Sequence, residues 1–350
     1  MKIGLYGYEG AGASTLFNAL TGQNVVTGFG GDKEKVHIGT VKVPDSRIDR
    51  LTELYSPKKT VFAELVFSDF PSKSKDQKGK SLGNISEAKS VDILALVIKA
   101  FSDKYSEEEV DAASELEMLL TEMAILDLEQ IERYIEKQSK VGKKDPQIIK
   151  IMEKMVPHLS EGLSIRTMEL SESEVLAMRG FSFLSSKRAL AAINVNEDKV
   201  AEGTAGDILE IAAKHGVMPF VLSAGVEEEI TSMETEDQEM FLDDMGLTEP
   251  VSGRFIRAAY ELSDLISFFT VGPDEVRSWP IARNTNARKA AGAIHSDLEK
   301  GFIRAEVFHY DDIIAVNGVE SELKKLGKHR LEGKDYIVKD GDILNIRFNV

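Results

Sequence analysis

The chain of 350 residues contains no cysteine, a single tryptophan and no long hydrophobic run. The absence of cysteine excludes disulfide bonds, thiolate catalysis and cysteine-ligated zinc. The longest apolar stretch, residues 91–101, includes Asp92 and Lys99 and is much shorter than the roughly 20 residues that a membrane-spanning helix needs. Met1 is followed directly by a strand-like segment at residues 2–6, where a signal peptide would show another pattern. We therefore expect a soluble cytoplasmic protein without a membrane segment.

Basic residues are outnumbered, with 43 lysines and arginines against 59 aspartates and glutamates and a net charge of −16. Phosphate attraction needs a cationic surface, so this charge argues against non-specific nucleic-acid binding by the whole molecule. A local basic segment remains, although acidic residues are interspersed in it. Its basic residues are Arg277, Arg283, Arg288, Lys289 and Arg304, and the acidic ones are Asp274, Glu275, Asp297 and Glu299. Both a mixed solvated surface and a local nucleic-acid contact stay open for that segment.

Short apolar runs bounded by turn signals recur along the chain, at residues 2–6, 61–70, 91–101, 189–195 and 217–224. Runs of this kind, separated by helical patterns, are typical of a buried parallel sheet with helices on its faces. The sequence therefore predicts an α/β fold with a doubly wound, mostly parallel sheet. At this length one hydrophobic core no longer grows, so we expect further domains.

Two other regions have different patterns. Apolar residues recur at helical spacing at Leu116, Leu120, Met123, Ile131 and Ile135, and again at Ile148, Met152, Met155 and Leu159. This pattern predicts an antiparallel helical hairpin inserted at residues 102–185. From residue 266 to the end, short runs such as 335–338 and 343–349 predict a small β-rich module. The α/β domain then comprises residues 1–101 and 186–262.

A glycine-rich loop follows the first run. Compared with the phosphate-binding pattern G-x-x-x-x-G-K-[ST], Gly7, Gly12 and Ser14 are in place, but Ala13 replaces the lysine. Glycines let backbone N–H groups surround an anion, and a serine hydroxyl at this position binds Mg²⁺. The residues predicted to surround the phosphates are Gly7, Gly10, Ala11, Gly12, Ala13, Ser14 and Thr15.

Ala13 lacks both the charge and the donor of lysine. A charge-assisted hydrogen bond contributes about 1.5–3 kcal/mol, or roughly one to two decades in affinity. The loss in hydrolysis is larger, because charge develops on the transferring phosphoryl group. We therefore expect weak binding to persist where hydrolysis does not.

Longer segments carry a family resemblance. TLFNALTG after the loop, VPDSRIDRL at residues 43–51, HSDLEKGFIRAEV at 295–307 and the last 20 residues together resemble the YchF family of Obg-related P-loop NTPases. The resemblance covers essentially the whole chain. It implies an OBG-type nucleotide-binding domain, an inserted coiled-coil hairpin and a C-terminal TGS domain of β-grasp-like form. It also implies ATP or GTP with Mg²⁺ as ligands, and ribosome association.

The resemblance extends to the side of the pocket that reads the base. Asn194 and Glu197 match the family's N-x-x-E pattern, which favours relaxed or adenine preference over guanine. Ser223 and Ala224, after the next strand, match the remaining base-side loop. An ordinary polar loop is the alternative interpretation of residues 194–197.

The γ-phosphate side departs from the family. Asp69 keeps the position associated with Mg²⁺, but Ser72 replaces a glycine and Lys33 aligns with the first switch threonine. The family's loop histidine is absent from residues 102–110. Lys33 or Lys73 could supply the charge that Ala13 lacks, although both also fit solvated loop lysines.

Three functions remain open: a slow Mg²⁺-dependent NTPase that regulates translation or a stress response, a nucleotide-binding scaffold without turnover, and a module that contacts ribosomal RNA. The concerted departures on the γ-phosphate side favour the second function. No catalytic residue is assigned, the metal ligands are expected to be Ser14 and Asp69, and ribosome or rRNA contacts are expected through the hairpin and the TGS domain. Nothing in the composition predicts more than a monomer.

Overall fold

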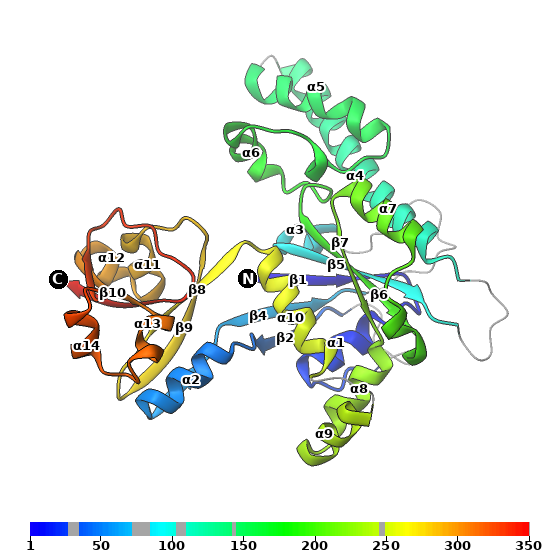
Figure 1. Cartoon of the computed structure of the whole chain (residues 1–350). Coiled ribbons are helices and arrows are strands. Elements are labelled where there is room, and N and C mark those ends of the chain that lie inside the picture. Colours follow the sequence, from blue (N-terminus) through cyan, green and yellow to red (C-terminus); the bar gives the residue numbers. More distant parts are fainter. Residues whose placement is uncertain (27–34, 72–84, 103–109, 142–144, 245–248, 350) are drawn as a thin grey trace. The chain divides into compact units, whose positions relative to one another are not determined.

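The computed structural model describes residues 1–26, 35–71, 85–102, 110–141, 145–244 and 249–349 (Figure 1). The chain divides into two compact units. The N-terminal unit comprises residues 1–41 and 66–255, and the C-terminal unit comprises residues 42–65 and 256–350. In the part of the chain that the structure describes, no helix is both long and apolar enough to span a membrane.

The N-terminal unit contains a sheet in the strand order β2-β4-β1-β5-β6-β7. The strands span His37–Lys42 (β2), Glu64–Asp69 (β4), Lys2–Tyr6 (β1), Ile93–Ala100 (β5), Arg188–Val195 (β6) and Met218–Leu222 (β7). From β4 to β7 every neighbouring pair is parallel, so the C-terminal ends of five strands lie at one edge of the sheet. The predicted doubly wound α/β sheet is confirmed, and β2 is a strand that the sequence analysis did not predict.

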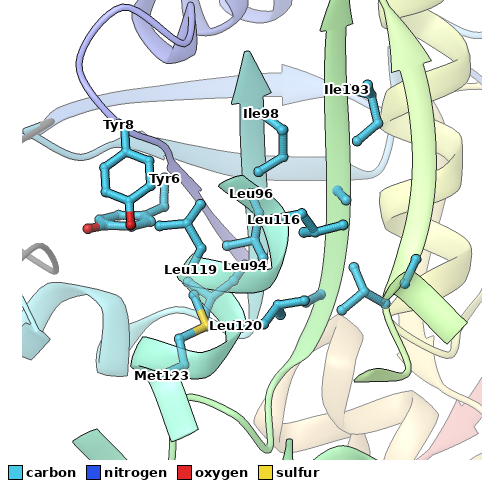
Figure 2. Packing of buried hydrophobic residues seen from close by; sticks show 14 of the residues in the cluster. Tyr6, Tyr8, Leu94, Leu96, Ile98, Leu116, Leu119, Leu120, Met123 and Ile193 are labelled. Carbon is cyan, nitrogen blue, oxygen red and sulfur yellow. The ribbon is translucent and has the colours of Figure 1, made fainter. Parts of the chain in front are cut away.

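Helices cover both faces of this sheet. On one face, the ring of Phe255 in α10 (Val251–Leu262) lies 5.3 Å from Phe220 and 6.4 Å from Phe67. On the other face lie α4 (Ala112–Val141) and α7 (Gly206–His215). Figure 2 shows Leu116, Leu119, Leu120 and Met123 of α4 packed beside Leu94 and Leu96 of β5. The remaining helices of the unit are α1 (Ala13–Thr21), α3 (Ile85–Ser90), α5 (Pro146–Ser160), α6 (Glu172–Met178), α8 (Ala224–Ser232) and α9 (Thr235–Asp244).

The helical insertion uses α4 in two ways. The first half of α4 packs on the sheet, whereas Ile131 in its second half packs with Met152 and Met155 of α5. Asp145 begins α5 by accepting a hydrogen bond from the Ile148 backbone N–H, which satisfies one donor at the helix end. The single apolar face that the sequence shows on α4 therefore serves two cores in succession.

The C-terminal unit contains a mixed sheet in the order β11-β10-β12-β8-β9-β3. Its strands span Arg330–Glu332, Phe302–His309, Asp342–Phe348, Leu265–Thr270, Glu275–Ala282 and Lys59–Val61, in that order. The parallel pairs are β8 with β12 and β3 with β9, and the other printed pairings are antiparallel. The predicted strand at residues 335–338 is wrong: only an isolated bridge joins Ile337 to Asn286, and the Tyr336 hydroxyl is held by Asp342.

Residues 42–65 pack with the C-terminal unit, although the predicted boundaries place them in the α/β domain. α2 (Ser46–Tyr55) buries Ile48 and Leu51, both 0% exposed, in one core with Phe269 and Phe308. A second core, which includes Ala287 and Ala290 of α11 (Ala287–Ile294), lies on the same sheet. The remaining helices of this unit are α12 (Ser296–Lys300), α13 (Tyr310–Ala315) and α14 (Glu320–Lys325). Residues 42–65 thus contribute a helix, α2, and an edge strand, β3, to a unit that is otherwise formed by residues 256–350.

Candidate functional site

The glycine-rich loop joins β1 to α1, at the edge where the parallel strands end. Gly10 and Gly12 have φ values of 83° and 91°, a region that side-chain-bearing residues avoid. A Cβ atom on Gly12 would lie 2.4 Å from Asn194 Nδ2, and one on Gly7 would lie 2.5 Å from the Val97 carbonyl oxygen. The loop therefore requires these glycines. Tyr8, which belongs to the loop, is buried in the core that Figure 2 shows, and this fixes the loop to the rest of the unit.

The start of α1 suits an anion. The first turn contains no acidic residue, and no side chain of the described residues caps its N-terminus. Unpaired backbone N–H groups and the helix dipole there favour a negative group. Ala13, where the motif has lysine, is 4% exposed and has only a methyl group. The loop thus offers backbone donors without a side-chain cation at position 13.

Ser14 and Asp69, the two predicted metal ligands, lie side by side. The Ser14 hydroxyl donates a 2.7 Å hydrogen bond to Asp69 Oδ2, and His37 Nδ1 of β2 lies 3.9 Å from the same oxygen. Burial raises the pKa of Asp69, although the Ser14 hydrogen bond and the nearby His37 lower it. Asp69 Oδ1 is buried without a hydrogen-bond partner among the described residues. A buried, unsatisfied carboxylate oxygen beside a serine hydroxyl fits a hard divalent cation such as Mg²⁺.

His37 is a site residue that the sequence analysis missed. It comes from β2, whose sequence HIGTVK has little apolar alternation, so the strand was not predicted. Its ring also lies against Phe17 of α1, with ring centroids 6.4 Å apart. Only the fold brings residue 37 next to residue 69, because β2 pairs with the strand that ends at Asp69.

Asn194 bridges two loops. At the end of β6, its Nδ2 donates to the Ala11 carbonyl oxygen and its Oδ1 accepts from the Ala224 N–H, both at 2.9 Å. The side chain is buried. The structure therefore brings Asn194, Ser223 and Ala224 to the phosphate loop, and it places Asn194 as a clamp between that loop and the start of α8.

Two other predicted residues differ in exposure. Ser223 precedes α8 and is buried, whereas Glu197 is exposed at the start of a 3₁₀ turn, Glu197–Glu202. The neighbouring Asn196 accepts a 3.0 Å hydrogen bond from the Ser102 N–H, which joins two strand ends. Lys33, Ser72 and Lys73, together with most of the loop at 102–110, lie outside the described residues.

A parallel sheet, a loop that requires glycine, a helix N-terminus and a serine–aspartate pair together define a P-loop protein of the GTPase fold class. Residues 2–154 match a family model described as a 50S ribosome-binding GTPase. Residues 265–349 match the model of the YchF GTPase C-terminal region, described as a protein of unknown function.

Whole-chain comparisons give the family. The chain is 38% identical to the ribosome-binding ATPase YchF of Haemophilus ducreyi, over 100% of this chain and 99% of that protein. It is 36% identical to the protein of the same name in Bacillus subtilis, over 100% of both. The solved structure of the Schizosaccharomyces pombe YchF GTPase superposes with a TM-score of 0.85 at 28% identity, covering 99% of this chain and 97% of the other. The chain belongs to the YchF family, as the sequence predicts.

Proposed function

We propose that this chain binds ATP or GTP together with Mg²⁺ at the phosphate loop and hydrolyses the nucleotide very slowly or not at all. One observation carries this proposal: the Ser14–Asp69 pair and the Asn194 clamp are formed, whereas a buried alanine occupies position 13. The binding residues would be Gly7, Gly10, Ala11, Gly12, Ala13, Ser14, Thr15, Asn194, Glu197, Ser223 and Ala224.

Ser14 and Asp69 would hold the metal. Mg²⁺, when bound, neutralises charge on the phosphate oxygens. The Ser14 hydroxyl now donates to Asp69 Oδ2. With the metal bound, the Ser14 hydroxyl oxygen and the Asp69 carboxylate would be its protein ligands. Because position 13 supplies no cation, the metal and the N–H groups at the start of α1 would carry most of the phosphate attraction.

An alternative is a slow Mg²⁺-dependent NTPase that regulates translation or a stress response. The names of the bacterial relatives, which call them ATPases, support this alternative. The observation that favours this alternative is His37, a titratable side chain near the metal-side carboxylate that the sequence motifs do not include. A single-turnover assay with His37→Gln separates the two proposals. A measurable rate in the wild type that falls in this variant would favour the alternative.

The names of the bacterial relatives, ribosome-binding ATPases, suggest the macromolecular partner. We propose that this chain binds the ribosome through the inserted hairpin, as a coiled coil at residues 102–185, and through a TGS domain at residues 266–350. A monomer that works in the cytoplasm fits this role. Co-sedimentation with purified ribosomes, compared between the wild type and a full-length variant with Arg288→Glu and Lys289→Glu, two exposed positions of α11, tests it.

Titration calorimetry with ATP, ADP, GTP and GDP, each with and without Mg²⁺, tests nucleotide binding. We expect Mg²⁺-dependent binding and little hydrolysis over hours. Absence of binding to all four nucleotides would leave a scaffold that acts only through its surfaces. Hydrolysis at the rate of its YchF relatives would overturn the proposed lack of turnover.

A further inference from the structure

Hydrogen bonds connect α8 both to the residue that holds the phosphate loop and to the start of α10. Its first residue, Ala224, donates its N–H to Asn194, whose amide also holds Ala11 of the phosphate loop. One turn later, Glu227 is 2% exposed and accepts hydrogen bonds from two backbone N–H groups of α10. These are the N–H groups of Val251 at 3.0 Å and Ser252 at 2.8 Å.

The Glu227 carboxylate caps the N-terminus of α10. The first N–H groups of a helix have no partner within it, and a carboxylate there also interacts favourably with the helix dipole. Glu227 satisfies two of these N–H groups from another element of the N-terminal unit, 24 and 25 residues earlier in the chain. The position of α10 is therefore tied to the position of α8.

α8 is held on α1 as well. Asn18 of α1 donates to Glu228 at 2.8 Å, and the Thr231 hydroxyl donates to the Ala19 carbonyl oxygen at 3.1 Å. Asn18 also bonds both backbone groups of Val25, the segment that follows α1. Both the loop before α1 and the chain after it are thus connected to one short helix.

α10 continues into the C-terminal unit, because the division between the units falls between Phe255 and Ile256, inside the helix. We infer that Glu227 is a positioning residue that couples occupancy of the phosphate loop to the N-terminal turn of α10, through Asn194 and the first turn of α8. This inference rests on the proposed nucleotide binding. A ligand that fixes the phosphate loop then stabilises the start of α10, and loss of the Glu227 cap weakens ligand binding by the same factor.

Hydrogen exchange followed by mass spectrometry, on peptides that cover the first turn of α10, tests the coupling in the full chain. GDP and ADP with Mg²⁺ are the probes, and the variants are Glu227→Gln and the matched control Glu229→Gln. Glu229 lies on the same helix and is exposed, so its substitution removes the same charge without removing the cap.

Saturating nucleotide should slow exchange at Val251 and Ser252 in the wild type and in Glu229→Gln. In Glu227→Gln these amides should exchange about ten- to a hundredfold faster, as expected for the loss of a charge-assisted bond. Nucleotide should no longer slow them, and nucleotide affinity should fall about fivefold or more. A purely structural cap would give faster exchange with unchanged affinity, and that result would overturn the inference.

A second variant separates failure of the coupling from failure of nucleotide binding. Asn194→Asp keeps an oxygen for the Ala224 N–H but removes the donor to the Ala11 carbonyl oxygen. If calorimetry shows no nucleotide binding, this variant still tests the path without ligand. Faster exchange at Val251 and Ser252 would support the coupling, and unchanged exchange there would refute it.

Discussion

The two units differ sharply in charge. The C-terminal unit contains 19 of the 43 basic residues and 19 of the 59 acidic residues, which cancel, so the N-terminal unit carries the whole net charge of −16. The unit with the phosphate loop is therefore the one that repels phosphate at long range. Under the proposed nucleotide binding, close contacts have to overcome this repulsion, and the proposed ones are the N–H groups of the loop and a metal at Ser14 and Asp69. Under the proposed ribosome binding, attraction to ribosomal RNA would have to come from local basic patches, because neither unit has a net positive charge.

The largest expected effect tests whether the units are separate cores. Leu51→Ala deletes a fully buried side chain from the core around Phe269 and should lower the free energy of unfolding by about 2–5 kcal/mol. The single tryptophan, Trp279, lies on β9 in the C-terminal unit, so its fluorescence reports that unit alone. We expect its urea transition to shift in Leu51→Ala.

Leu16→Ala is the matched control, because Leu16 is equally buried but lies in α1 of the N-terminal unit. It should leave the Trp279 transition in place while it shifts the transition measured by far-UV circular dichroism, a signal to which the N-terminal unit contributes most of the helix. Equal shifts of the Trp279 transition in both variants would show that the two units unfold as one.

The next prediction concerns position 13 of the phosphate loop, in the acidic N-terminal unit. Ala13→Lys should raise ATP affinity by about one to two decades, because a charge-assisted hydrogen bond contributes about 1.5–3 kcal/mol. The binding should also depend less on Mg²⁺. Calorimetry measures both effects, and Ala13→Gln is a control of similar size without charge. Equal affinities for the lysine and glutamine variants would mean that charge is not what position 13 lacks.

The phosphate loop could be predicted from the sequence because its information is local. Gly7, Gly12 and Ser14 lie within eight residues, and the strand before them is a simple apolar run. Asp69 was assigned to the metal through its match to a family motif. Its hydrogen bond with Ser14 depends on the parallel pairing of β1 with β4, which the sequence analysis did not predict.

The remainder depended on contacts between distant parts of the chain. Helical spacing at Ile48 and Leu51 indicates an apolar face, but not that this face packs on Phe269, more than 200 residues later. The amide of Asn194 matches a base-reading motif, yet its two hydrogen bonds go to Ala11 and Ala224. In the sequence, Glu227 lies among other glutamates and looks like a solvated residue. Only the fold shows that it is buried against the start of α10.

The third prediction concerns the unpaired carboxylate oxygen of the acidic unit. Because burial raises the pKa of Asp69, its charged form costs stability, and this cost appears as the pH rises from the ordinary aspartate value through the raised pKa. Asp69→Asn should therefore stabilise the metal-free protein at neutral pH, seen as a higher midpoint in thermal unfolding. The same variant should lose the Mg²⁺ dependence of nucleotide binding.

In the wild type, Mg²⁺ affinity should fall as the pH decreases through the raised pKa of Asp69, because protonation removes a ligand charge. Calorimetric Mg²⁺ titrations in the presence of nucleotide, across this pH range, measure the effect. An affinity that does not change with pH would contradict the assignment of Asp69 as a metal ligand. An asparagine variant that is less stable at neutral pH would contradict the raised pKa of Asp69.

The smallest effect concerns how the C-terminal unit balances its charge. Lys58 and Asp274 form an ion pair with an N–O distance of 2.7 Å, but their side chains are 81% and 80% exposed. Exposed pairs contribute little because water and salt screen them, so Asp274→Asn should change the free energy of unfolding by less than about 0.5 kcal/mol. Trp279 fluorescence in urea measures this change.

Asp342→Ala is the informative contrast, because Asp342 is fully buried and its Oδ2 accepts hydrogen bonds from the Tyr336 hydroxyl at 2.7 Å and the Lys339 N–H at 2.8 Å, both of which alanine removes. Losing such bonds costs about 1–3 kcal/mol. A large effect of Asp274→Asn, or a negligible one of Asp342→Ala, would contradict this assignment. If both results are as expected, the exposed Lys58–Asp274 pair contributes little to the stability of the C-terminal unit, and Lys58 can exchange Asp274 for a polyanionic partner at little cost.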